Sequence, residues 1–364
     1  MWTEDSFKHV DPALLQSFVE AICLRMGADD DVADEVANHL VSADLSGHRS
    51  HGVLRLIQHS AELDRGDLAP KRRPEVVSQR NATLLLDGGR GFGHFSTRIA
   101  CEYGLEIAAR EGAAAVLVRR SGHIGRLGHY CELISQQGLV CLLTVGAAGP
   151  DIGVMMLPGT TQRFLAANPW AIGIPGDDHP VVVDISTTMI AEGKVTWAAS
   201  SGQPVPPDCI VDAEGRPSRD PDAYFGGGAI LPLGGLIASH KGFGLGLAAA
   251  LLGGLAMIND SDPTLAGSQR PPRSTRRPEL AGVCLIVIDP NAFGGRRPYR
   301  SAVTRLVREM RGAGEARTTV TVPGAFEERN RTAHRGGLAL PSTTVTQLSD
   351  LADRFGISNP FDAA

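Results

Sequence analysis

The stretch Ser239-His-Lys-Gly-Phe-Gly-Leu-Gly-Leu-Ala-Ala249 decides between two folds for this chain. Its Gly244-x-Gly246-x-x-Ala249 matches the fingerprint that opens the phosphate-binding helix of a Rossmann domain. Such a fingerprint follows directly on a strand, but no convincing strand precedes these glycines. We therefore expect them inside a buried, closely packed helix. The lysine-bearing start of that helix, at His240 and Lys241, is a candidate anion site because helix N-termini attract negative charge.

Outward from this stretch, the periodicity of apolar residues predicts helical chain ends around a mixed central region. The first 66 residues show helical spacing only, with a first helix from Asp11-Pro12 to about Gly27. The expected strands are 83–86, 114–118, 139–145, 164–166, 181–184 and 283–288, and the later helices are 96–111, 301–311, 326–335 and 344–355. The fold class expected is α/β (α+β), with no internal repeat.

Composition narrows the class of protein. Glycine makes up 43 of 364 residues, and the net charge of −5 disfavours a nucleic-acid binder. The six cysteines form no C-x-x-C pair, which is typical of buried thiols in a reducing compartment. The N-terminus lacks the pattern of a signal peptide, and the apolar run 244–258 is short for a bilayer span. We expect a cytoplasmic protein with no nucleic-acid or membrane partner.

The segment Ser46-Gly-His-Arg-Ser-His-Gly52 is the first candidate site. A histidine in a loop before a helix suits general acid/base work, because its pKa lies near neutrality. Capping of the next helix by Ser50 explains the same residues equally well. A metal-dependent hydrolase or lyase that uses His48, His51 and Asp44, or His39 in place of Asp44, is a further alternative.

Two more candidate sites follow strands. Ser121-Gly-His-Ile-Gly-Arg126 comes after one strand, where α/β proteins assemble ligand sites, so His123 is a candidate functional residue. Asp184-Ile-Ser-Thr-Thr188 follows another, with Gly193-Lys194 behind it. An aspartate there can orient an imidazole or bind a ribose, although helix capping again accounts for the hydroxyls. The basic segment 268–277 is interpreted as a solvated loop, or less readily as a clamp for an anion.

Taken in order, these segments resemble the malate/L-lactate dehydrogenase family that is distinct from the Rossmann-fold lactate and malate dehydrogenases. The resemblance spans about Leu14 to Phe355. It is carried by Ser50-His51-Gly52-Val53-Leu54-Arg55, Gly122-His123-Ile124-Gly125, Asn168-Pro169, Ile174-Pro175, Asp184 with Thr187, Thr188, Gly193 and Lys194, Lys241 to Leu245, and Pro323-Gly324.

The resemblance implies an NAD- or NADP-dependent oxidoreductase that interconverts a 2-keto (or cyclic 2-imino) acid with the 2-hydroxy (or amino) acid. It implies a homodimer acting on a small carboxylate. It also implies three parts of the chain: an N-terminal helical part (1–75), a large non-Rossmann nucleotide-binding α/β domain (76–324), and C-terminal helices that pack on the N-terminal part (325–364).

The same resemblance implies a role for each matched residue, and no metal ligand. His51 is expected to exchange the proton, helped by Ser50 and oriented by Asp184. Arg55 is expected to grip the substrate carboxylate, and His123 to lie between substrate and nicotinamide. The expected dinucleotide contacts are His123, Asn168, Pro180, Val182, Asp184, Ile185, Ser186, Lys194, His240, Lys241 and Gly324.

Three departures from the family pattern concern this site. Ala166-Ala167 stands where Gly-Thr is usual, Glu192 replaces a common arginine, and Ile124 replaces a phenylalanine. They favour an altered substrate or cofactor preference, and they keep open a silent homologue that binds nucleotide without turnover.

Overall fold

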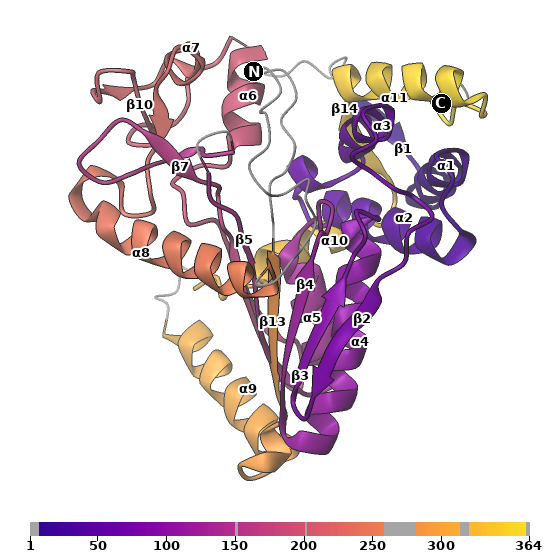
Figure 1. Ribbon diagram of the computed structural model, residues 1–364, viewed down its shortest axis with the longest axis vertical. Coiled ribbons are helices and arrows are strands. Elements are labelled where there is room, and N and C mark those ends of the chain that lie inside the picture. The colour runs from indigo at the N-terminus through magenta and orange to yellow at the C-terminus, as the bar shows by residue number, and fades with distance from the viewer. Residues whose placement is uncertain (1–6, 150–151, 201, 258–281, 314–319, 362–364) are drawn as a thin grey trace.

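The computed structural model describes residues 7–149, 152–200, 202–257, 282–313 and 320–361 and is built on a mixed seven-stranded sheet (Figure 1). The strand order is β2-β3-β4-β13-β5-β8-β9. Only β3 and β4 run parallel within it, whereas a Rossmann sheet is parallel throughout. The strands are β2 (Glu75–Arg80), β3 (Thr83–Asp87), β4 (Ala113–Arg119), β13 (Gly282–Ile288), β5 (Val140–Gly146), β8 (Trp170–Ile174) and β9 (Val181–Ile185).

Helices cover both faces of this sheet. α4 (Gly93–Glu111) and α5 (Leu127–Gln136) lie on one face and enclose a core with the apolar side chains that alternate along β4, β5 and β13. α8 (Gly235–Gly254) lies on the other face. A Cβ at Gly146 in β5 would overlap the backbone of Ala249, so this glycine allows α8 to approach the sheet closely.

The fingerprint glycines lie inside α8, as expected, and the backbone is non-helical at Ala238 just before Ser239. The expectation that this helix is buried was wrong, however. Gly242, Gly246, Ala249 and Gly253 face the protein, but Leu245, Leu247 and Leu251 between them are exposed, Leu251 by 65 %. Gly235–Met257, which combines α8 with η3 (Leu255–Met257), is the one described helix long and apolar enough to cross a membrane, a test that core helices of soluble proteins also pass.

The two chain ends build one helical unit with a core of its own (Figure 1). Asp11 caps the first helix by accepting hydrogen bonds from the backbone N–H groups of Ala13 and Leu14. The helices are α1 (Pro12–Arg25), α2 (Asp30–Leu45), η2 (Arg49–His51), α3 (Arg55–Asp64), α10 (Ala325–Ala333) and α11 (Ser342–Phe355). The N-terminal segment is not purely helical, because β1 (Phe7–Val10) pairs with β14 (Leu338–Pro341) near the other end of the chain.

A smaller sheet of order β11-β10-β12-β6-β7 packs with α6 (Glu192–Ser200) and α7 (Pro221–Phe225). Its strands are β11 (Pro217–Ser218), β10 (Ile210–Val211), β12 (Ala229–Ile230), β6 (Met155–Met156) and β7 (Arg163–Leu165). η4 (Pro290–Ala292) and α9 (Arg296–Gly312) follow β13. The basic segment 268–277 lies outside the described residues.

Candidate active site

The turn that joins α2 to α3 is held by a buried carboxylate. Oδ2 of Asp44 accepts a hydrogen bond of 2.8 Å from the backbone N–H of Val53, and burial raises the pKa of Asp44 to about 7. Gly52 lies directly over this carboxylate, where a Cβ would overlap it. Asp44 therefore holds Gly52 and Val53 in place at the far end of the turn, and Ser50 and His51 lie between Asp44 and these two residues.

His51 lies beside His123 in the structure. The two rings stack at 5.7 Å between centroids, and Nδ1 of His51 lies 3.0 Å from the hydroxyl of Ser50. Burial, followed by the charge of Arg55, lowers the pKa of His51 to about 3. The imidazole is therefore neutral at neutral pH and carries a free lone pair.

Arg55 stands at the start of α3, close to the histidine pair. Its Nε donates to the carbonyl of Ser50 at 2.6 Å, and its Nη1 donates to Gln58 at 2.5 Å. Nη2 makes no hydrogen bond within the described part of the chain. A cation held in this way can grip a carboxylate, since a guanidinium stays protonated even where burial lowers its pKa.

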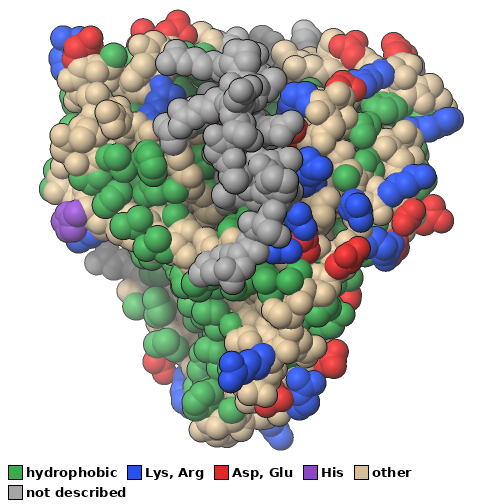
Figure 2. Space-filling view, in the orientation of Figure 1, with side chains coloured by type: hydrophobic (Ala, Val, Ile, Leu, Met, Phe, Trp, Pro, Cys, Tyr) green, Lys and Arg blue, Asp and Glu red, His purple; other side chains and the backbone are tan. Residues whose placement is uncertain are grey.

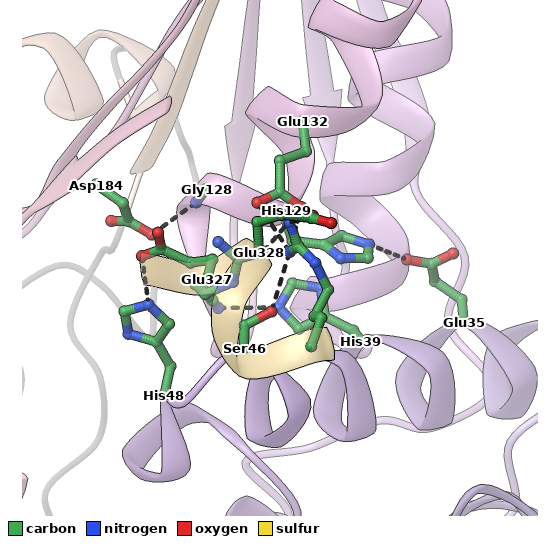
Figure 3. A network of polar contacts seen from close by, with 12 residues as sticks. Glu35, His39, Ser46, His48, Gly128, His129, Glu132, Asp184, Glu327 and Glu328 are labelled. Carbon is green, nitrogen blue, oxygen red and sulfur yellow. Dashed lines mark hydrogen bonds and ion pairs between the residues drawn. The ribbon is translucent and has the colours of Figure 1, made fainter. Parts of the chain in front are cut away.

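Asp184 occupies a different place from the expected one. Its Oδ2 accepts a hydrogen bond of 2.7 Å from the backbone N–H of Gly128, and burial raises its pKa (Figure 3). Nδ1 of His51 is hydrogen-bonded to the Ser50 hydroxyl instead, so the structure does not join Asp184 to the His51 ring. Figure 3 places Asp184 beside His48 and Glu327.

The metal alternative based on His48, His51 and Asp44 is not supported. Nε2 of His48 is bound to Glu327 at 2.9 Å, and Asp44 is bound to Val53. Within the described ranges, the side-chain groups that could hold an ion are made of other residues.

Two of the expected dinucleotide contacts line one cavity of about 410 Å³. Pro180 and Gly324 form part of its wall, and the N–H of Val182 lies 3.4 Å from the carbonyl of Pro323. Gly324 has a φ of +94°, which a glycine adopts without strain. Arg311 and Arg329 also line this cavity and bring positive charge to it.

The other expected contacts do not line this cavity. The Asn168 side chain is occupied at both ends, because it accepts from the N–H of Ala147 and donates to the carbonyl of Gly246. Ser186 contacts Thr188 at 2.6 Å between hydroxyl oxygens. Ile185 is exposed at the end of β9, His240 and Lys241 are exposed in α8, and Lys194 is exposed in α6.

Two of the residues that depart from the family pattern make hydrogen bonds in the structure. Glu192 accepts a hydrogen bond of 2.6 Å from the hydroxyl of Tyr224, and the carbonyl of Ala167 accepts from the Thr187 hydroxyl at 2.8 Å. Gly193 lies next to Ser50, since a Cβ added at Gly193 would be 3.8 Å from the Cβ of Ser50, so α6 reaches the histidine turn. Sequence reasoning did not connect these two segments.

Three further histidines, His59, His94 and His129, were missed by the sequence analysis. His94 adjoins His123 at 5.8 Å between ring centroids, and a file of rings continues from it through His39 to His129. Together with His39, these three histidines come from four different helices. No spacing in the sequence could have signalled the group.

The malate/L-lactate dehydrogenase family profile matches residues 10–349. Hydroxycarboxylate dehydrogenase B of Escherichia coli (strain K12) is 31 % identical over 97 % of this chain and 96 % of its own length. The Delta(1)-pyrroline-2-carboxylate/Delta(1)-piperideine-2-carboxylate reductase of Pseudomonas syringae pv. tomato is 32 % identical over 90 % and 91 %. A solved putative malate/lactate dehydrogenase from E. coli superposes with a TM-score of 0.85 at 28 % identity, covering 98 % of both chains.

Proposed function

The chain belongs to the malate/L-lactate dehydrogenase family, and we propose that it interconverts a 2-keto or cyclic 2-imino acid with the corresponding 2-hydroxy or amino acid. It is an oxidoreductase of a family that acts on small carboxylates and generally uses nicotinamide cofactors. The observation that carries the proposal is the buried pair of His51 and His123 beside Arg55.

In this proposal Arg55 holds the substrate carboxylate through a two-point contact, for which its planar guanidinium is suited. Ser50 fixes both partners, because its carbonyl holds Arg55 and its hydroxyl holds Nδ1 of His51. The substrate thereby lies with its reacting carbon near the two rings. Asp184 acts at a distance, by holding the first turn of α5 at Gly128, just after the loop that carries His123.

His51 moves the proton. Its neutral ring accepts the hydroxyl proton of a 2-hydroxy acid, so the empty enzyme is ready for oxidation. In reduction, the negative charge of the substrate favours the protonated ring, which then donates to the developing oxyanion. A bound nicotinamide supplies or accepts the hydride.

The cavity beside Pro180 and Gly324 fits a dinucleotide. Its volume of about 410 Å³ lies in the range of ligand pockets, about 300–1,000 Å³. Three arginines line it, of which Arg331 is paired with Glu132 and Glu328. A Cβ at Gly324 would come within 3.4 Å of the Pro180 carbonyl and narrow the cradle. Pro180 and Gly324 would hold the cofactor, and Arg311 and Arg329 would meet its phosphates. NAD and NADP both remain candidates.

We also propose a cytoplasmic homodimer in which α8 forms the interface. Hydrophobic side chains gather over α8 in Figure 2, and Leu236, Ile237 and Leu251 are 48 %, 98 % and 65 % exposed. Apolar surface of this kind is typical of an interface. All six cysteines are free and buried, which fits a reducing compartment.

The test measures NADH and NADPH oxidation with pyruvate, oxaloacetate, other 2-keto acids and cyclic imino acids. We expect turnover with at least one of them, a loss of about 10²–10⁴-fold in kcat for His51→Ala, and an increased KM for Arg55→Lys. The surface variant His9→Ala is the control. Near-normal turnover in His51→Ala refutes the assignment, and nucleotide binding without turnover on the whole panel favours a silent homologue.

A further inference from the structure

Three histidines of the ring cluster converge from three different segments. His59 lies in α3, His94 in α4 and His123 in the loop before α5, and one ring nitrogen of each lies within 4.8 Å of the other two. His59 and His94 are 1 % and 0 % exposed. The proposed reaction gives a role only to His123. The other two are buried imidazoles that still need an explanation.

Three ring nitrogens of this group lack hydrogen-bond partners among the described residues. Nε2 of His59 and both nitrogens of His94 form no hydrogen bond with the described residues. Leaving buried polar atoms unpaired costs free energy, so such atoms point to a missing ligand or water. Burial also lowers the pKa of His94 and His123 well below the ordinary value, which leaves both rings neutral. A neutral imidazole is the commonest metal ligand in proteins.

His59 is already oriented as a metal ligand would be. Its Nδ1 lies 3.2 Å from Oε2 of Glu62, and Oε1 of Glu62 accepts from Gln58 at 2.7 Å. Metal-binding histidines commonly donate the second ring N–H to a carboxylate, which directs the lone pair of the other nitrogen at the ion. The Glu62 charge also offsets the nearby Arg55 cation.

We propose that His59, His94 and His123 bind a divalent transition metal ion of the zinc class. Three atoms at the 4.8 Å limit lie about 2.8 Å from their common centre, so each moves by about 0.7 Å or less to reach a zinc–nitrogen distance of about 2.1 Å. His123 makes the largest change, because it gives up the hydrogen bond of 3.2 Å that its Nδ1 accepts from Gly125.

A neighbouring group, Glu35, His39 and His129, has similar spacing and is seen in Figure 3. It fits an ion less well because of His39. Nε2 of His39 accepts a hydrogen bond of 2.8 Å from the backbone N–H of Arg126, so the proton of the neutral ring sits on Nδ1. To bind an ion, His39 has to break this bond, which is shorter than the 3.2 Å bond that His123 gives up. His129 consequently serves as the matched control.

The experiment titrates chelator-treated protein with Zn²⁺ by calorimetry and with Co²⁺ by visible absorption. We expect one ion per chain and the ligand-field bands of a low-symmetry Co²⁺ site. His94→Phe weakens Zn²⁺ binding by at least about 100-fold, and Glu62→Gln weakens it by about 10–100-fold because it removes the carboxylate behind His59. His129→Gln stays within about twofold of the wild type.

Unchanged Zn²⁺ affinity in both His94→Phe and Glu62→Gln overturns the proposal, as does the absence of a tight site in the wild type. Loss of binding in His129→Gln alone moves the ion to the neighbouring group and overturns it too. Circular dichroism checks that His94→Phe folds, and Glu62→Gln carries the test if it does not.

Occupancy of the site also inhibits the enzyme, since His123 stacks on His51. That part rests on the proposed function. Binding is read without turnover, so a protein that binds Zn²⁺ but reduces nothing counts only against the proposed function.

Discussion

Gly52→Ala tests the clamp that holds the histidine turn. The backbone of Gly52 has φ −89° and ψ −156°, which alanine adopts without strain, so only space decides the outcome. A Cβ there falls under 3.0 Å from three atoms of the Asp44 carboxylate, a separation that real Cβ atoms do not show. Asp44 is 2 % exposed and has to leave its hydrogen bond with Val53 to make room.

The cost has two parts. Overpacking of a filled site costs about 1–3 kcal/mol, and loss of a hydrogen bond to a charged group costs about 1.5–3 kcal/mol. We therefore expect the free energy of unfolding to fall by about 2–6 kcal/mol, measured by chemical denaturation followed by circular dichroism. Turnover falls with it, because Ser50 and His51 lie between the clamped residues.

Two controls separate this explanation from a general effect of alanine. Gly193→Ala places a methyl 3.8 Å from Ser50, an ordinary contact within a helix, and leaves stability unchanged or slightly raised. In an Asp44→Ala background, the space vacated by the carboxylate accepts the new methyl, so Gly52→Ala costs less than about 1 kcal/mol there. An equal loss in both backgrounds refutes the reasoning.

Three further predictions concern stability and assembly. The pKa of Asp44 rises from 3.8 to about 7 on folding, so its contribution to stability falls as the pH rises through that window. Thermal unfolding of Asp44→Asn between pH 5 and pH 8 is expected to lack this decline. The same pH dependence in the wild type and in Asp44→Asn contradicts the assignment. Gly146→Ala places a methyl group against the backbone of Ala249 and lowers the unfolding free energy by about 1–3 kcal/mol or more. Gly254→Ala has open space at its Cβ and does not lower it. Equal unfolding curves for the two variants would be the contrary result. Leu251→Asp introduces a charge into the exposed face of α8 and converts the dimer to monomers in light scattering, and a wild type that is already monomeric removes the proposed interface.

The larger elements were predictable because each carries a local signal. The strand at 283–288 is a continuous apolar run, and the capping pattern at Asp11-Pro12 marks the first helix. The family model confirms the family that the ordered motifs indicate, and the match to a solved structure confirms the fold class. The roles assigned to His51, Arg55 and His123 stay predictions.

What escaped the sequence depends on partners far along the chain. β1 has four residues, and its partner β14 lies more than 300 residues away, so no local pattern marks it. β2 is exposed along its length and has no apolar alternation. The prediction that α8 is buried was wrong because its small residues indicate close packing, and in the structure only one side of the helix is packed. The role of Asp184 was inferred from its position in the family motif. Only the structure shows that its carboxylate accepts a hydrogen bond from the backbone N–H of Gly128.

The core shared by the two chain ends has a consequence for synthesis on the ribosome. Its N-terminal contributors end at Phe95, and its C-terminal contributors begin at Leu338. At about 5–20 residues per second, roughly 10–50 s separate the emergence of the two groups. During that interval α1, α2 and α3 present an apolar face without its cover, so this core closes only after the segment from Leu338 onward has left the ribosome.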